Sequence, residues 1–492
     1  MSEPLEPESE PARSKPSSEP IGAPNLTPTI RAAGRSRLVA AVLSFVWPGL
    51  GQLYSRRRVA AAVFAVPVVV AAIWLALQLA NGPDYFGASF LDNSFALTFV
   101  VGVGLLGLWR LASMIHAYAV AGPRRPPSKV DSAVVVVLLV AVVAAHGLAA
   151  ELALAAYNFD NAVVSNQLIP DEPTPAPTGV AAVSPSPTAA WTPTITGPPE
   201  LTPSPRVRAA PSHRITILLT GVDFLAGRHH AMNDSILIAS VDTRTYKAAI
   251  LSIPRDTSNF PFYWGGNAGI NTKINNFATL VAQGAIHAPD PAATALAKEV
   301  GWLVGLKVDY YVIVDIAGFG SLVDAAHGVC VTNPKAINDP STGTFIPAGH
   351  QCMDGPTTLK YVRSREGAGD TDYTRSRRQQ DVLIALSKKL ISPSGIVYIS
   401  SVLSVAGKTV QTNFPLKDAR NYISLATSVG TTTVSQCVLG PPFNYHPPTA
   451  ATKGTWTSRL KMYMVADLSV YLFGTDSRYY GMEGIAPARC AQ

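Results

Sequence analysis

One stretch in the C-terminal half of the chain concentrates arginine, at residues 361–380. Its first part reads YVRSRE and contains Arg363 and Arg365, two residues apart. In an extended segment alternate side chains point to one face, so we expect these two guanidinium groups to lie side by side. Guanidinium groups are planar donors that match the oxygens of phosphate.

The second part of the stretch, DTDYTRSRRQQ, places further polar side chains at helical spacing. Arg375, Arg378 and Gln379 stand at positions i, i+3 and i+4, so on a helix they share one face near its N-terminal end. Arginines gathered at a helix N-terminus predict a site for a highly anionic ligand. The alternative is a solvated basic helix face, in which the arginines pair with neighbouring carboxylates: Glu366, Asp370, Asp372 and Asp381.

A further arginine, Arg255, follows an apolar run that is halted by Pro254, within SIPRDT. Proline fixes the backbone direction where the chain leaves a strand, so we expect Arg255 at the rim of a sheet. The alternative is a turn that is closed by an ion pair between Arg255 and Asp256.

Two carboxylates stand at the boundaries of expected strands. Asp223 closes one apolar run and Asp234 opens the next. Strand ends are where α/β sheets place ligands, and paired carboxylates suit Mg²⁺, or Mn²⁺ in its place, with phosphate supplying further oxygens. Aspartate is also common in turns and helix caps, so a purely local role is the competing interpretation.

The elements that would position these residues begin at residue 213. Strands are expected at 214–220, 235–241, 247–253 and 310–314, and helices at 271–283, 291–304, 317–326 and 374–390. This interleaving predicts an α/β domain with a central mixed β-sheet flanked by helices.

An apolar region, residues 37–157, precedes this domain. Three of its stretches, 59–79, 95–119 and 132–156, have the length of ~20 residues that a membrane-spanning helix needs. The stretch at 38–54 is short and broken by Pro and Gly, and arginines flank it on both sides, so we expect a re-entrant or interfacial hairpin.

Basic residues predict the orientation of these spans. The arginines at 35–37 and 56–58 and the basic loop at 123–129 belong on the cytoplasmic side, whereas the loop between the first two spans lacks Lys and Arg. Three spans then deliver the domain at 213–492 to the outside of the cell. The protein is therefore expected to be multi-pass, with an extracytoplasmic C-terminal domain.

Two segments have the composition of unfolded chain. Residues 1–36 are rich in Pro, Ser and Glu and are expected to form a disordered cytoplasmic tail. Residues 158–212 are expected to be an extended linker, because Pro, Thr and Ser recur throughout 169–212. This linker would hold the exterior domain away from the membrane.

Charge and cysteine content narrow the function further. The net charge of +7 is largely explained by basic residues that flank apolar stretches, and we find no nucleic-acid-binding motif. The four cysteines lack the short spacing of a zinc site, and an even number outside the cytosol favours disulfides. Of three available pairings, closeness in sequence favours Cys330 with Cys352 and Cys437 with Cys490.

The motifs of residues 215–390 resemble those of the LytR-CpsA-Psr family. In chain order they are LLTGVD, NDSILIASVD, LSIPRDT, KINNFA, VDYYVIVDIAGF, LVDAAHGVCV, AGHQCMDG, and YVRSRE followed by DTDYTRSRRQQ. The resemblance implies an extracytoplasmic α/β domain, anchored in a bacterial cell membrane, with an apolar cleft for a polyprenyl chain. The three expected spans are more elaborate than the family's common single helix.

The resemblance also implies roles for single residues. Asp223 and Asp234 look like ligands of Mg²⁺. The residues that look like binders of the lipid pyrophosphate are Arg255, Lys273, Arg363, Arg365, Arg375, Arg378 and Gln379. Of these, Arg255, Arg363 and Arg365 would also be catalytic, by stabilising the charge that grows on the leaving lipid phosphate.

Family members resemble phosphotransferases that move a glycopolymer phosphate, as in teichoic acid or capsule, from a polyprenyl pyrophosphate carrier onto peptidoglycan. The expected partners are therefore the lipid-linked glycan, peptidoglycan and the membrane. Two alternatives stay open. One is a binding module that holds a polyprenyl phosphate lipid without turnover, as a sensor or carrier, and the other is a pyrophosphatase that transfers to water.

Overall fold

The structure is a computed structural model. It describes residues 36–80, 82–122, 128–165, 168–169, 213–223, 232–340, 343–365, 371–392, 395, 398–430, 434–452, 454–481 and 490. Residues 1–35 of the expected tail and 170–212 of the expected linker lie outside the described residues. The chain divides into two compact units, one of residues 1–66 and 110–140 and the other of residues 67–109 and 141–492.

The first unit contains two short helices, α1 (Arg37–Val46) and α2 (Leu50–Tyr54). The backbone turns between them at Gly49, where φ is 103° and a Cβ atom would lie 2.6 Å from the Ala61 carbonyl oxygen. Gln52 is fully buried here and donates a hydrogen bond to the Ser113 carbonyl at 2.8 Å. With ten and five residues, α1 and α2 are both shorter than the ~20 residues that a bilayer requires.

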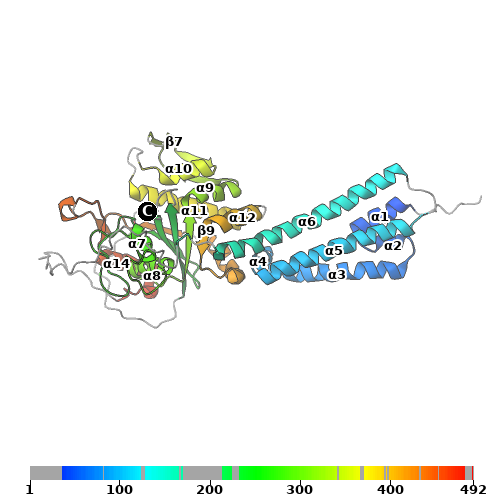
Figure 1. Cartoon of the computed structure of the whole chain (residues 1–492), viewed down its shortest axis with the longest axis horizontal. Coiled ribbons are helices and arrows are strands. Elements are labelled where there is room, and N and C mark those ends of the chain that lie inside the picture. The colour runs from blue at the N-terminus through cyan, green and yellow to red at the C-terminus, as the bar shows by residue number, and fades with distance from the viewer. Residues whose placement is uncertain are drawn as a thin grey trace, which may run out of the picture. The chain divides into compact units, whose positions relative to one another are not determined.

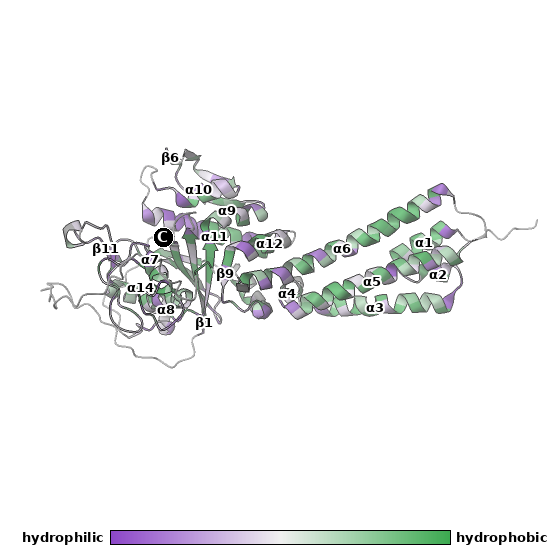
Figure 2. Cartoon of the chain, viewed as in Figure 1, coloured by the Kyte–Doolittle hydropathy of each residue, from purple (hydrophilic) through white to green (hydrophobic). Residues whose placement is uncertain are grey.

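Within the part of the chain that the structure describes, three helices are long and apolar enough to cross a membrane: α3 (Arg58–Leu79), α5 (Asn93–Val120) and α6 (Lys129–Ser165). Apolar residues dominate along each of them (Figure 2). The short helix α4 (Pro83–Ser89) lies between α3 and α5 in the sequence. All three long helices coincide with expected spans, although α6 continues past the expected end at residue 156.

The C-terminal domain is built on a six-stranded sheet in the order β10-β3-β2-β1-β4-β9. Its strands are β1 (Arg214–Asp223), β2 (Met232–Asp242), β3 (Ala248–Ser252), β4 (Tyr310–Asp315), β9 (Val410–Thr412) and β10 (Val434–Val438). Strand β1 pairs antiparallel with β2 and parallel with β4, so the sheet is mixed. The predicted α/β fold class is confirmed.

Helices cover both faces of this sheet (Figure 1). One layer contains α7 (Ile274–Ala282), α8 (Ala292–Val304) and α14 (Met462–Phe473). The other contains α9 (Ile316–Ala325), α10 (Gly355–Arg363), α11 (Asp372–Ile391) and α12 (Ile399–Thr409), and α13 (Ile423–Gly430) follows α12 in the chain. Alternate residues of β1 and β2, such as Leu218 and Ile238, are fully buried in the core against α7 and α8. Burial of these alternate apolar side chains fixes the register of the sheet.

Among the described residues, three small ladders stand apart from the main sheet. They pair β5 (Val329–Asn333) with β8 (Gly349–Met353), β6 (Ile337–Asp339) with β7 (Thr344–Ile346), and β11 (Asn444–Tyr445) with β12 (Arg459–Leu460). Cys330 lies opposite Cys352 in the first ladder, and their sulfurs are bonded at 2.04 Å. Cys437 of β10 is bonded to Cys490.

The expected start of the linker at residue 158 is wrong. Helix α6 continues to Ser165, and Leu168 and Ile169 are buried in the domain core. The Ile169 N–H donates to the side-chain oxygen of Gln411 at 2.8 Å, and the Gln411 amide donates to the Ile169 carbonyl at 3.3 Å. The hydrophobicity of Leu168 and Ile169 explains this difference, because their burial removes apolar surface from water.

Candidate functional site

The candidate site lies at one edge of the main sheet. Strands β1 and β3 end at this edge, and β2 begins there because it runs antiparallel to both. Strand β10 is parallel to β3, so it also ends at this edge. The C-terminal ends of β1, β3 and β10 are thereby brought together, although they are far apart in sequence.

A β-bulge sets the position of Asp234. Gly221 pairs with Ser235 and Val222 pairs with Asn233, which leaves Asp234 as an extra residue on β2. Asn233 takes the fully buried position, where its amide donates to the Thr220 hydroxyl at 2.9 Å. A bulge re-aims a side chain out of the regular alternation, and here it keeps the Asp234 carboxylate off the core face.

Arg255 lies beyond the end of β3 and connects two carboxylates. Its Nη1 pairs with Oδ1 of Asp234, and its Nε lies 3.8 Å from Oδ2 of Asp256. The other oxygen of Asp256 accepts a hydrogen bond from Nζ of Lys273 at 2.6 Å, and Lys273 precedes the first residue of α7. Asp256 therefore bridges two cations at the rim of the sheet.

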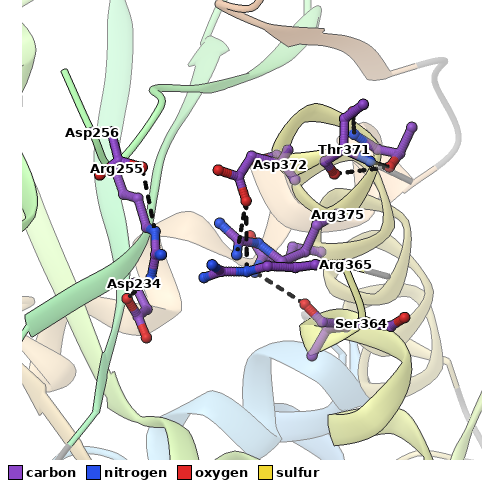
Figure 3. Close-up of polar contacts among 12 residues, drawn as sticks. Asp234, Arg255, Asp256, Ser364, Arg365, Thr371, Asp372 and Arg375 are labelled. Atoms are coloured by element: carbon purple, nitrogen blue, oxygen red, sulfur yellow. Dashed lines mark hydrogen bonds and ion pairs between the residues drawn. The ribbon is translucent and has the colours of Figure 1, made fainter. Parts of the chain in front are cut away.

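A second group of charges lies at the N-terminal end of α11. Thr371 caps this helix by accepting a hydrogen bond from the Thr374 N–H, in a capping box. Oδ1 of Asp372 lies 3.1 Å from Nη1 of Arg375 and 3.5 Å from Nε of Arg365. Figure 3 shows these two arginine side chains converging, opposite Arg255 and its carboxylates.

Arg375 is the most deeply buried charge in this group, with 6% of its side chain exposed. Burial lowers its pKa to about 10, and the nearby Arg365 and Arg255 act in the same direction, whereas Asp372 opposes them. The group stays cationic at neutral pH, so it is a desolvated positive charge that an anionic ligand would stabilise.

The extended conformation expected for the YVRSRE segment is wrong at Arg363, which is the last residue of α10. Ser364 is the C-cap of this helix, and Arg365 follows it. The two arginines therefore take different partners. Nη2 of Arg363 lies 3.5 Å from Oδ2 of Asp223, at the end of β1.

Arg378 and Gln379 share a face of α11 as expected, but this face is directed at α10. Arg378 donates to the Ser364 carbonyl at 2.5 Å, and Gln379 donates to the Val362 carbonyl at 3.3 Å. Among the described residues, neither lines the pocket that contains Arg255 and Arg375. Both side chains hold the C-terminal end of α10, and they position Arg363 and Arg365 in this way.

The sequence reasoning missed Gln380, which anchors α11 to the sheet. Its fully buried amide donates to the Ser252 hydroxyl and to the Cys437 carbonyl, both at 2.7 Å. These bonds tie α11 to the ends of β3 and β10, so the first turn of the helix lies over the sheet edge. A glutamine in a run of polar residues carries no sequence signal for this role.

A pocket opens between these groups. Its charged lining residues are Asp234, Arg255, Asp256, Asp372 and Arg375, and Ile236, Ile253 and Pro254 add apolar surface. On another side it is lined by Tyr373, His446, Trp456 and Ser458. The sequence reasoning also missed these last residues, because three of them follow β10, outside the arginine-rich motifs.

The donor atoms at Asp223 and Asp234 fit a divalent cation that takes further oxygens from phosphate or water. The arginine contacts use Oδ2 of Asp223 and Oδ1 of Asp234, and the second oxygen of each carboxylate makes no such contact within the part of the chain that the structure describes. Another cluster, Cys330, His350 and Cys352, fits a metal less well, because its two sulfurs are joined in a disulfide.

A family model and several known proteins match parts of this chain. The family model described as the LytR_cpsA_psr family matches residues 196–471. The cell wall biosynthesis protein LcpA of Corynebacterium glutamicum is 31% identical over 212 residues, which are 40% of this chain and 40% of LcpA. The polyisoprenyl-teichoic acid–peptidoglycan teichoic acid transferase TagU of Oceanobacillus iheyensis is 29% identical over 212 residues, which are 43% of this chain and 62% of TagU.

The chain thus spans between 40 and 62% of the length of these two relatives. Among solved structures, that of TagV from Bacillus subtilis is similar, with a TM-score of 0.41 and 20% identity. The matched region covers 53% of this chain and 98% of that one.

Proposed function

Because this chain belongs to the LytR_cpsA_psr family, we propose that it is a cell wall phosphotransferase, which moves a glycopolymer phosphate from a polyprenyl pyrophosphate carrier onto peptidoglycan. The observation that carries the proposal is the pair of opposed charge groups in the pocket, one around Arg255 and the other around Arg375. The names of similar proteins, such as the teichoic acid transferase TagU, support the same substrate class.

The arginines of the site would bind the pyrophosphate. Arg255 and Arg375 line the pocket, and Arg365 joins them through Asp372. Arg363 stands at the end of β1 beside Asp223, and Lys273 reaches the pocket rim through Asp256. Planar guanidinium groups stabilise the charge that develops on the leaving lipid phosphate, because they are already oriented before the reaction begins.

Asp223 and Asp234 would hold Mg²⁺, or Mn²⁺ in its place. When bound, such an ion supplies Lewis acid stabilisation of phosphate oxygens. The ion pairs of these aspartates with Arg363 and Arg255 would hold the two carboxylates in position for that role.

The membrane region would anchor the enzyme at the bacterial cell membrane as a multi-pass protein. Helices α3, α5 and α6 supply three candidate spans, and α1 and α2 form the expected re-entrant hairpin in this proposal. The resulting orientation puts the domain from residue 213 outside the cytosol, where the bonds Cys330–Cys352 and Cys437–Cys490 would be stable.

The test uses the full chain in detergent micelles with a polyprenyl pyrophosphate-linked glycan and peptidoglycan oligomers, and mass spectrometry identifies the products. We expect a glycan phosphate joined to the oligomer. The product should be lost with a chelator and in Arg363→Ala, and it should persist in Arg377→Ala. Arg377 is a matched control because it contacts Asp381 and the Gln436 carbonyl, outside the pocket.

Two other outcomes would replace the proposal. Release of free glycan phosphate, in the presence of acceptor, would indicate a pyrophosphatase that transfers to water. Tight binding of the lipid without cleavage, with or without metal, would indicate a binding module.

A further inference from the structure

Tyr373 and His446 approach each other on the side of the pocket that lacks arginine. Tyr373 stands in the first turn of α11, which Gln380 ties to β3 and β10. His446 follows β11, in the segment that continues from the end of β10. The sheet order places β10 beside β3, so this late segment returns to the edge where Arg255 leaves β3.

The hydrogen bonds of this pair define which atoms donate and which accept. Nδ1 of His446 lies 2.9 Å from the Thr457 carbonyl oxygen. A carbonyl oxygen only accepts, so Nδ1 carries the proton and Nε2 presents a lone pair. Nε2 lies 3.0 Å from the Tyr373 hydroxyl, which therefore donates to it. The Asn444 amide donates to the same hydroxyl oxygen at 2.9 Å.

Packing holds the pair in place. Asn444 is buried, and its amide also donates to the Ser458 hydroxyl at 2.7 Å. The ring of Trp456 stacks on His446 with 4.2 Å between centroids. The ring of Tyr373 covers Gly440, where an added Cβ atom would lie 2.7 Å from it. Each ring thus has one orientation, which a group that handles a proton requires.

The charges around the pair favour a neutral tyrosine. The charged side chains that share this pocket are Asp234, Arg255, Asp256, Asp372 and Arg375. Burial raises the pKa of Tyr373, and Asp372 and Asp256 raise it further, although the Asn444 hydrogen bond opposes them. A tyrosine that stays neutral is not the final acceptor of a proton. It can take a proton on its oxygen only while it gives its own proton to a histidine.

We propose that Tyr373 and His446 form the acceptor side of the pocket, and that they carry the proton away from the attacking hydroxyl of the acceptor sugar. This inference rests on the proposed function. The acceptor oxygen forms the new bond to phosphorus while its proton passes to the Tyr373 oxygen and the original Tyr373 proton passes to Nε2 of His446. The bond from phosphorus to the lipid phosphate breaks, and its electron pair stays on that phosphate. His446 leaves the step as an imidazolium and later releases its proton to water.

Trp456 extends this side of the pocket toward the solvent. It lines the pocket, and 55% of its surface remains exposed although it stacks on His446. A large exposed aromatic surface beside a polar pocket is typical of a binding site. The class of acceptor that this surface fits is a sugar, which presents an apolar ring face together with a hydroxyl group.

The experiment uses the full chain in detergent micelles and compares the wild type with Tyr373→Phe and His446→Gln. Transfer is measured at saturating donor between pH 5 and 9, and donor binding is measured separately. We expect both variants to lower kcat by about 100-fold or more, in the range of general base catalysis, while donor affinity is unchanged. The pH profile of the wild-type rate should show a fall on the acid side, because protonation of the imidazole removes the lone pair that accepts the proton. The residual rate of His446→Gln should lack this fall.

Two matched variants serve as controls. Tyr445→Phe removes the hydroxyl of the neighbouring exposed tyrosine, and His287→Gln removes an exposed histidine; both residues lie outside the pocket lining. Wild-type rates in Tyr373→Phe and His446→Gln, or a parallel loss of donor binding and rate, would overturn the relay alone. A wild-type protein that binds donor and never transfers would overturn the proposed function and the relay with it.

Discussion

The guanidinium group of Arg363 lies 3.5 Å from the carboxylate of Asp223, although 140 residues separate the two in sequence. This contact joins the C-terminal end of α10 to the C-terminal end of β1. It brings together one residue that we propose to bind phosphate and one that we propose to bind metal.

The first prediction concerns metal binding. Asp223→Asn and Asp234→Asn each remove one anionic ligand, so we expect the affinity for Mn²⁺ in the presence of inorganic pyrophosphate to fall at least about tenfold, as for other losses around a metal site. Electron paramagnetic resonance of the full chain measures the free ion. Asp381→Asn, which alters a carboxylate on α11 outside this pocket, is the control. Unchanged affinity in both site variants would rule out this ligand assignment.

The second prediction separates two arginines of the same helix. Arg375→Gln removes a buried charge from the pocket. We expect the binding free energy of polyprenyl pyrophosphate to become about 1.5 to 3 kcal/mol less favourable, which is the contribution of a hydrogen bond to a charged group. Arg377→Gln should change it little, because this side chain is directed elsewhere. Isothermal titration calorimetry of both variants measures the difference, and equal losses would contradict the proposed binding mode.

The third prediction concerns the anchor of α11. Gln380→Leu leaves the Ser252 hydroxyl and the Cys437 carbonyl without their donor, so we expect the domain to lose about 1 to 3 kcal/mol of stability. Differential scanning fluorimetry would record this loss as a lower Tm. Gln351→Leu, which removes one exposed hydrogen bond, is the matched control and should have little effect. Equal Tm values for the two variants would show that Gln380 does not anchor the helix.

The fourth prediction concerns pH. Glu299 is fully buried, and burial raises its pKa from 4.5 to about 8, although the Tyr263 N–H and Arg478 act in the opposite direction. The folded state therefore holds this proton more tightly than the unfolded state. The resulting stabilisation is complete below pH 4.5 and is lost as the pH rises to about 8.

Glu299→Gln keeps the shape of this side chain and removes its titration. The stability of the wild type relative to this variant should fall with pH by at most ~1.4 kcal/mol per unit. Thermal unfolding of both proteins from pH 4.5 to 9 measures this difference. A difference that is constant across this range would mean that the buried carboxyl group does not titrate as we infer.

The fifth prediction concerns the proposed topology. Ser94→Cys adds a thiol at the start of α5, and Ser128→Cys adds one directly before α6. Both serines are exposed and the substitution is nearly isosteric. In intact cells a membrane-impermeant maleimide should label only Ser94→Cys, and it should label Ser128→Cys after permeabilisation. The reverse pattern would place the C-terminal domain inside the cell.

Much of the fold follows from local patterns. The runs expected as strands at 214–220 and 235–241 lie within β1 and β2, and the helix expected at 291–304 coincides closely with α8. These elements bury continuous apolar faces, so the runs and spacing of apolar residues in the sequence locate them. Strands β9 and β10 were missed because they are short, and they are defined by pairing with strands that lie far away in sequence.

The candidate site was predictable only where charge is concentrated. Arg375 stood out because it belongs to a run of five arginines within residues 363–378, and Arg255 stood out because it follows the strand end at Pro254. The hydrogen bonds that Arg378 and Gln379 donate to the C-terminal end of α10 could not be predicted. Helical spacing shows that residues share a face, but it does not show what that face contacts. Tyr373 and His446 were missed because their proximity depends on the pairing of β10 with β3.

The burial of Leu168 and Ile169 changes what the proline-rich segment can do. The chain leaves the domain at Ile169, which is bonded to Gln411, and it returns at His213, directly before β1. Both ends of the intervening 170–212 segment are thus fixed to the same body. An insertion or deletion there would change the size of a closed loop and would leave the connection between α6 and the domain unaltered.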